Sequence, residues 1–160
     1  MKKKGFALLI AVIFVAVMLA FGLALSALSY KQAVLSSGSV GSQRAFYAAD
    51  AGMECVLSAD QQQGLFAYPA TDPGSAPGVT CDGTAVGGTE RYSSSVWTLS
   101  YRLPLDGNAY CADVSVYKYA APQPPSNLIT KIYAQGYDVS CAAVNAGTAR
   151  FSSRGLKIRY

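Results

Sequence analysis

The sequence contains no histidine, and only 14% of its 160 residues carry a formal charge. The missing histidine removes the most common general base and the most common metal ligand of proteins. Lysines at positions 2–4 supply three of the four net positive charges, so the rest of the chain is near +1 (4 − 3). This balance does not indicate nucleic acid as a partner. Nor is there a nucleophile motif. We therefore expect no enzyme, no catalytic residue, no cofactor and no metal site.

Close cysteine pairs are also missing. Cys55, Cys81, Cys111 and Cys141 follow one another at spacings of 26, 30 and 30 residues, whereas zinc sites usually contain C-x-x-C pairs. An even number of cysteines behind an export-like start favours two disulfides, formed outside the reducing cytosol. Four cysteines permit three pairings.

The N-terminal region holds one long apolar run. The 26 residues between Lys4 and Lys31 are uncharged, and about 20 apolar residues suffice for a helix to cross a bilayer. The leading lysines predict a cytoplasmic N-terminus, with the rest of the chain outside. The run is either a secretory signal cut near Ala27-Leu28-Ser29, a plain anchor, or a segment trimmed at its start and retained. Signal peptides usually have shorter apolar regions of about 7–15 residues, which disfavours the first interpretation.

Two short stretches bear on the third interpretation. The start KKKGFALLI resembles the leader of type IV prepilins and pseudopilins, and AFYAADAG at 45–52 is similar to the N-terminal region of PilX-type minor pilins. The resemblance covers roughly residues 1–57. It implies that a prepilin peptidase cuts between Gly5 and Phe6, that Phe6 is N-methylated, and that the apolar helix is kept. That helix would anchor the subunit in the membrane and later pack among other pilin subunits.

One position departs from the pattern of major pilins. In those proteins the fifth mature residue is a glutamate that neutralises a neighbouring subunit's N-terminal ammonium, whereas counting from Phe6 gives Ile10 here. A buried ammonium without an opposite charge is costly. We therefore expect a minor or tip subunit.

The expected organisation has a leader over 1–5, a transmembrane and assembly helix over 6–35, and an extracytoplasmic domain over 43–160. Between them, SSGSVGS at 36–42 contains residues that weaken helices. This stretch is either a flexible joint or part of a continuous helix.

The domain is expected to begin with a helix over 43–62. Apolar residues recur there at the spacing of one helix face, namely Phe46, Ala49, Met53, Val56 and Leu57. Asp50 and Glu54 lie on a different stripe of the helix. Because no nucleophile or metal ligand accompanies them, we interpret them as solvated helix charges.

Residues 63–92 are rich in glycine and proline and predict a loop, with Cys81 able to staple it. Four strands are expected after it, at about 94–103, 109–120, 129–141 and 149–160, in an antiparallel meander. Their alternation predicts an inner face packed on the helix, made of Trp97, Leu99, Val114, Val116, Ile132, Ala134, Leu156 and Ile158. The fold class is therefore α+β, a long N-terminal helix on a four-strand antiparallel meander. The pilin resemblance implies the same arrangement.

The connections suggest how the first expected strand pairs with the second, and how the third pairs with the fourth. Asp-Gly at 106–107 predicts a two-residue hairpin turn, which sets Leu99 opposite Val114. A loop centred near Ala146 would then set Leu156 opposite Gly136.

Strand pairing also suggests a disulfide. If the proline-rich connection is centred on Ser126, Cys111 faces Cys141, and cross-strand neighbours are close enough for a disulfide after slight adjustment. That pairing leaves Cys55 for Cys81, tying the helix to the loop.

The same alternation places four tyrosines on the outer face of the sheet, with Arg102, Lys157 and Arg159 nearby. They are Tyr117, Tyr119, Tyr133 and Tyr137. Tyrosines beside basic residues suit recognition of sugars, proteins or nucleic acid strands, which makes them candidate contacts for a surface ligand. The competing explanation is that tyrosine simply favours strands.

The expected function is that of a structural minor subunit of a type IV pilus or pseudopilus. Its partners would be the prepilin peptidase, other pilin subunits and a surface ligand. It would cross the cytoplasmic membrane once, with its C-terminal domain outside, and reach the cell-surface pilus on assembly. Two alternatives remain: an adhesin or DNA-uptake module on the same scaffold, and an anchored or secreted disulfide-bonded domain unrelated to pili.

Overall fold

The computed structural model describes residues 4–69, 71–121, 127–147 and 150–160, which fall into two compact units divided between Ser39 and Val40. The elements in chain order are α1 (Lys4–Gln61), β1 (Val79–Cys81), β2 (Thr84–Val86), β3 (Thr89–Ser93), β4 (Val96–Leu105), β5 (Tyr110–Ala120), β6 (Leu128–Tyr137), α2 (Cys141–Ala146) and β7 (Ser153–Arg159).

Helix α1 includes the serine- and glycine-rich stretch 36–42, whose backbone is helical. Serine and glycine lower helix propensity by at most about 1 kcal/mol per residue, and the stretch contains no proline. The boundary between the two units falls inside it, between Ser39 and Val40.

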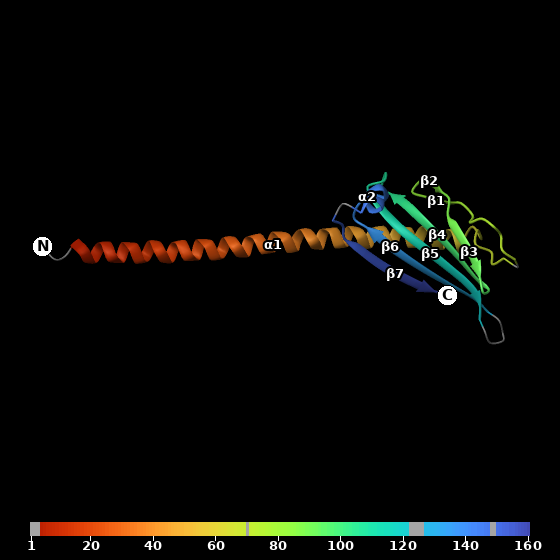
Figure 1. Ribbon diagram of the computed structural model, residues 1–160, viewed down its shortest axis with the longest axis horizontal. Helices are drawn as coiled ribbons and strands as arrows, with labels where there is room; N and C mark the ends of the chain where they lie inside the picture. The colour runs from red at the N-terminus through yellow and green to blue at the C-terminus, as the bar shows by residue number, and fades with distance from the viewer. Residues whose placement is uncertain (1–3, 70, 122–126, 148–149) are drawn as a thin grey trace. The chain divides into compact units, whose positions relative to one another are not determined.

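The domain of residues 40–160 confirms the α+β class. Five antiparallel strands lie side by side in the order β3-β4-β5-β6-β7, and the second half of α1 runs across one face of this sheet (Figure 1). All eight predicted inner-face residues are buried or packed against the core. The core therefore lies between the sheet and the second half of α1.

The helix face in this core differs from the predicted one at Phe46, whose ring is 43% exposed. Small residues take its place against the sheet, and the buried positions are Ala45, Ala48, Ala49, Gly52, Met53, Val56 and Ala59. This row also has the 3- and 4-residue spacing of a helix face. It keeps Ala49, Met53 and Val56 of the predicted face and adds smaller residues on one side, so Phe46 lies outside it.

Two glycines explain why small residues line this face. A Cβ atom on Gly136 of β6 would lie 2.2 Å from the backbone oxygen of Ala45 and from the backbone nitrogen of Ala49. A Cβ atom on Gly52 of α1 would lie 2.8 Å from the Cβ atom of Ala112. The helix backbone therefore approaches the sheet more closely than any larger side chain would allow.

The sheet has one strand more than the predicted four. The expected loop over 63–92 contains the β1–β2 hairpin and β3, which extends the sheet beyond β4. In β3 the inward residues are Glu90 and Tyr92, and Glu90 accepts a hydrogen bond of 2.7 Å from the indole nitrogen of Trp97. This tertiary contact accounts for the half-buried, inward position of a glutamate that was predicted to lie in a polar loop.

The predicted register of the first hairpin was wrong by two residues. Leu99 pairs with Val116 instead of Val114. The turn is centred on Gly107 and Asn108, both at positive φ, and the amide of Ala109 donates to the carbonyl of Asp106 at 3.1 Å. The turn thus begins one residue later than predicted. A shift of two preserves which face each side chain occupies, so the inner-face prediction survives.

The other two registers also differ. Ser126, the predicted loop centre, lies outside the described residues, and Cys111 pairs with Tyr137 rather than Cys141. Strand β6 ends at Tyr137, before the predicted end at residue 141, because Cys141 begins helix α2. Ser140 caps that helix by accepting a hydrogen bond from the amide of Ala143 at 3.3 Å. The predicted start of the last strand, residue 149, also lies outside the described residues.

The β6–β7 pairing is displaced by two residues from the prediction. Leu156 faces Ala134, and Gly136 faces Arg154. Helix α2 occupies part of the connection between these strands. The alternation of the strands had predicted a simple loop centred near Ala146 for that connection.

Candidate functional site

The first half of α1 is an apolar surface. Its large apolar side chains are exposed throughout, from Phe6 at 71% to Leu35 at 74%. In the described part of the chain, one helix, α1, is long enough and apolar enough to cross a membrane. Burying a large apolar side chain is worth about 1.5–3 kcal/mol. This surface therefore needs an apolar environment, either lipid or other helices.

The predicted cleavage residues Gly5 and Phe6 lie in the first turn and a half of α1. Ile10 is half exposed on the same helix. The first acidic residue of the whole sequence is Asp50, so no carboxylate interrupts the apolar half. A shallow apolar groove of about 380 Å³ runs along it past Ala11 and Ala16. Small residues of this kind let a second helix approach closely.

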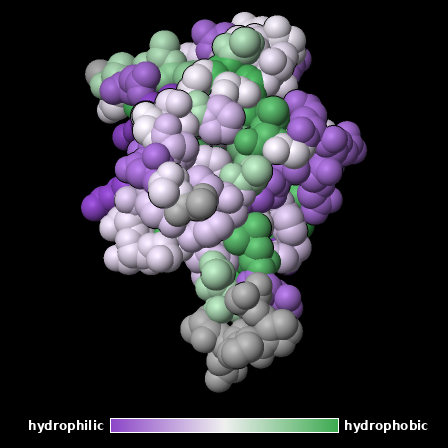
Figure 2. Space-filling view, turned by 90° about the vertical axis from the view of Figure 1, so that its right-hand side faces the viewer, coloured by the Kyte–Doolittle hydropathy of each residue, from purple (hydrophilic) through white to green (hydrophobic). Residues whose placement is uncertain are grey.

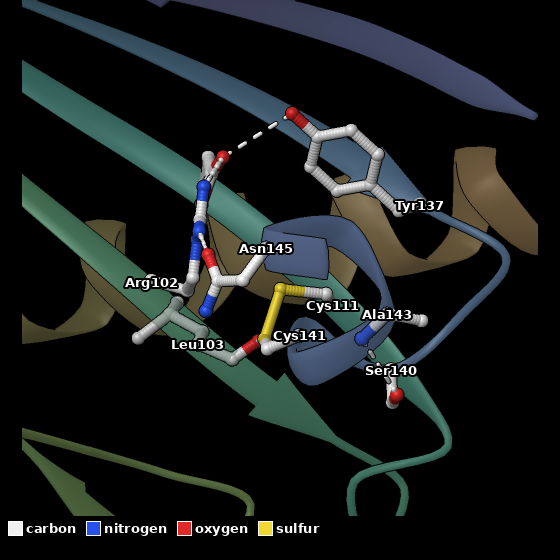
Figure 3. Close-up of a disulfide and its surroundings, with 9 residues drawn as sticks. Arg102, Leu103, Cys111, Tyr137, Ser140, Cys141, Ala143 and Asn145 are labelled. Atoms are coloured by element: carbon white, nitrogen blue, oxygen red, sulfur yellow. Dashed lines mark hydrogen bonds and ion pairs between the residues drawn. A yellow bond between two sulfur atoms is a disulfide. The ribbon is translucent and has the colours of Figure 1, made fainter. Parts of the chain in front are cut away.

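The domain contains the two disulfides that the sequence analysis favoured, Cys55–Cys81 and Cys111–Cys141. The first links α1 to the β1–β2 hairpin. The second has a Cα–Cα distance of 4.8 Å and joins β5 to the first residue of α2 (Figure 3). The pair was predicted from a strand register that does not exist. Its geometry comes from α2 lying against the end of the sheet.

Three of the four predicted tyrosines form a cluster on the outer sheet face. The rings of Tyr117 and Tyr133 meet edge to face at 5.6 Å. The ammonium of Lys131 lies over the ring of Tyr119 at 5.2 Å, and that of Lys157 over the ring of Tyr133 at 5.8 Å. We call these five side chains the tyrosine–lysine face.

The fourth tyrosine, Tyr137, lies apart from this cluster. It is only 8% exposed, its ring meets Phe151 edge to face at 5.5 Å, and its hydroxyl donates to Asp113 at 3.2 Å. Burial and the neighbouring Asp113 carboxylate raise the pKa of Tyr137. Its prediction as a surface contact was wrong, because the region around α2 covers this end of the outer face.

Arg102 belongs to the same end of the sheet. Its guanidinium pairs with both oxygens of Asp113, at 2.6 and 2.7 Å, and also donates to Asn145 of α2. Figure 3 shows Arg102, Tyr137 and Asn145 grouped beside the disulfide. These contacts hold α2 on the sheet, which leaves Arg102 committed to a structural role.

A buried ion pair, Lys118–Asp60, was not predicted from the sequence. The ammonium of Lys118 on the inner face of β5 lies 2.5 Å from Asp60 near the end of α1, and these side chains are 6% and 7% exposed. The hydroxyl of Tyr160 donates to the other oxygen of Asp60 at 2.5 Å. The alternation of β5 places Lys118 on the same face as Val114 and Val116. This alternation was the sequence signal from which the inward position of Lys118 could have been predicted.

The remaining carboxylates form no metal-binding cluster within the described ranges. Glu54 is exposed and Asp50 is half-buried on α1. No group of three His, Cys, Asp or Glu side chains capable of holding a metal ion occurs among the residues that the structure describes.

The architecture is α+β, with a long N-terminal helix on an antiparallel sheet, which is consistent with the arrangement that the pilin resemblance implies. Comparison of the chain with known protein families, with curated proteins and with solved structures gives no match.

Proposed function

We propose that this chain is a minor structural subunit of a type IV pilus or pseudopilus. A prepilin peptidase would cut between Gly5 and Phe6 and the new N-terminal Phe6 would be methylated. The retained helix would hold the subunit in the cytoplasmic membrane, with the domain outside, and then pack against helices of other pilin subunits. The observation that carries the proposal is the apolar half of α1, exposed over its whole length and followed by a disulfide-bonded domain.

The energetics of the helix support a role in assembly. Each large apolar side chain that moves from water into lipid or a helix bundle gains about 1.5–3 kcal/mol. Lipid tails are as apolar as leucine, so leaving lipid for a bundle depends on close packing. The groove past Ala11 and Ala16 supplies a surface for such packing.

Ile10 supports a minor rather than a repeating role. Its apolar side chain offers no countercharge for an N-terminal ammonium in an apolar bundle, where an unpaired charge is costly. A subunit present once, or a few times, meets this cost once or a few times. A repeating shaft subunit meets it at every position.

The domain supports an outward position. Its two disulfides suit an oxidising compartment. Figure 2 shows a face where hydrophilic and weakly polar residues predominate and apolar residues form separate patches. A surface of this kind is stable in water, in contrast to the first half of α1.

Mass spectrometry of the mature N-terminus tests the proposal. We expect that cells producing the full chain together with a prepilin peptidase yield a protein that begins with methylated Phe6. Gly5→Val should leave the precursor uncut, because cleavage follows that glycine. Gly22→Val is the matched control, since a Cβ atom at Gly22 meets nothing within 4 Å. It should be processed normally.

Two results would contradict the proposal. A mature start near Tyr30 would indicate ordinary secretion, and a retained Met1 would indicate a plain anchor. Recovery of processed protein from the sheared surface fraction, and its loss from that fraction in Gly5→Val, would separate a filament subunit from a processed membrane protein.

A further inference from the structure

The outer sheet face carries a hollow that filament assembly does not explain. It has a volume of about 350 Å³ and is lined by Val96, Tyr117, Tyr119, Lys131 and Tyr133. Strands β4, β5 and β6 supply these side chains through the pairs Val96–Tyr119 and Tyr117–Lys131. The site therefore stands on three hydrogen-bonded strands rather than on loops.

A second hollow of about 330 Å³ adjoins the first, because Tyr133 lines both. Asp113, Ser115, Gln135 and Lys157 contribute polar groups to it, and the carboxylate of Asp113 is paired with Arg102. Gly155 also lines it and adds no side chain, which keeps it open at β7. Each hollow is at the small end of the range for ligand pockets. Together they suit a chain of small units better than one bulky group.

The charge of this face is one-sided. Outward positions of the five strands carry five cations, and the one acid among them, Asp113, is held by Arg102. The four cations without that partner are Arg91, Lys131, Lys157 and Arg159. Complementarity therefore calls for an anionic ligand.

The polar groups narrow the ligand further. Phenol hydroxyls and lysine ammonium groups donate hydrogen bonds to carboxylates and hydroxyls, and the exposed ring edges offer apolar contact. We propose that the tyrosine–lysine face binds an acidic oligosaccharide, a chain of sugar units that carry carboxylates. This site is independent of the proposed filament role, since none of its residues belongs to α1.

Nucleic acid fits this face less well. Single strands bind such surfaces by stacking bases on open aromatic faces. Here Lys131 lies over Tyr119, Lys157 lies over Tyr133, and Tyr117 is held edge to face against Tyr133. The ammonium groups above the rings are in place for a carboxylate instead.

Calorimetric titration of the full-length protein tests the proposal. The protein is held in micelles of a polyoxyethylene detergent, which contains no sugar, and titrated with trigalacturonate, a sialylated trisaccharide, neutral galactotriose and a short oligothymidylate. We expect saturable binding of at least one acidic sugar, weakened by salt. Galactotriose should bind at least about tenfold more weakly, because it lacks the charge-assisted hydrogen bonds.

Three variants locate the site. Lys131→Gln should weaken binding of the acidic sugar by about 10- to 100-fold, the effect of losing a hydrogen bond to a charged group. Tyr133→Ala should weaken it at both hollows. Arg150→Gln is the matched control, because it removes the same charge from an exposed residue that lines neither hollow. It should bind like the unchanged protein.

Folding is checked by the fluorescence of Trp97, which is buried under the opposite face. Failure of both acidic sugars to bind overturns the proposal. So does an equal loss in Arg150→Gln and Lys131→Gln, which would indicate general charge attraction. Tighter binding of oligothymidylate than of either acidic sugar would assign the face to nucleic acid instead.

Discussion

Lys118→Met isolates the contribution of the buried ion pair Lys118–Asp60. Methionine keeps most of the apolar stem but removes the ammonium, which leaves the carboxylate of Asp60 buried with only the hydroxyl of Tyr160 beside it. Breaking a buried ion pair by removing one partner costs about 3–5 kcal/mol. For a domain of this size that loss lowers Tm by about 10–20 °C.

The double variant Lys118→Met/Asp60→Leu separates charge from packing. Replacing a buried ion pair by apolar residues of similar volume is often neutral or stabilising, because neither charge then has to be desolvated. We expect the double variant to lie within about 1–2 kcal/mol of the unchanged protein, far above the single variant. Lys131→Met, the same change on the outer face of β6, should shift stability by no more than about 0.5 kcal/mol.

Urea unfolding of the full chain in micelles measures these differences. Trp97 is the single tryptophan of the sequence, is buried in the sheet core, and pairs with Lys118 across β4 and β5. Because Lys118→Met changes its surroundings, transition midpoints should be compared rather than intensities, and far-ultraviolet circular dichroism should agree. A single variant that loses less than about 1 kcal/mol would refute the reasoning. A double variant as unstable as the single variant would show that lost packing, and not the unpaired charge, causes the loss of stability.

Three further predictions concern packing, cross-linking and pH. Gly136→Ala should destabilise the domain by about 1–3 kcal/mol or more, because the added Cβ atom meets the backbone of α1. Gly155→Ala should be tolerated, because a Cβ atom there comes no nearer than 3.8 Å to its neighbours. Similar Tm values for the two variants would contradict the close approach of α1 to the sheet. Replacing Cys111 and its partner by serine should cost about 2–5 kcal/mol in urea unfolding, and a loss below about 1 kcal/mol would show that the cross-link is dispensable. Burial raises the pKa of Tyr101, whose hydroxyl donates to the carbonyl of Pro77 at 2.7 Å. The folded state therefore holds this proton after the unfolded state has lost it at about pH 10. The free energy of unfolding that the protonated Tyr101 hydroxyl contributes is fully present below that pH and is lost as the pH rises above it. Tyr101→Phe should make stability fall less steeply in this alkaline range, and an unchanged slope would count against the assignment.

The faces of the strands were predictable, whereas their registers were not. Alternation along β4 and β5 places Leu99 and Val116 inward whether or not they are partners, since a shift of two residues changes no face. The actual turn depends on a distant group. The amide of Asp106 donates to the carboxylate of Asp82 at 2.7 Å, which holds the residue before Gly107 in place. No local pattern encodes that contact.

The same limit applies to the sites. The tyrosine–lysine face followed from alternation alone, but Tyr137 shares its face with the other tyrosines and is covered only because α2 and Phe151 lie at that end. The inward position of Lys118 could have been predicted from the alternation of its strand. Its pairing with Asp60 could not have been predicted, because the pairing depends on where α1 ends over the sheet.

The two disulfides close successive, non-overlapping loops, from Cys55 to Cys81 and from Cys111 to Cys141. In the proposed topology the N-terminus stays on the cytoplasmic side, and the domain emerges outside in chain order, so that Cys55 arrives first and Cys141 last. An oxidant that joins each arriving thiol to the one free thiol already outside then makes both native bonds in order of arrival. Such a chain has little need of the slow reshuffling that interleaved cross-links require.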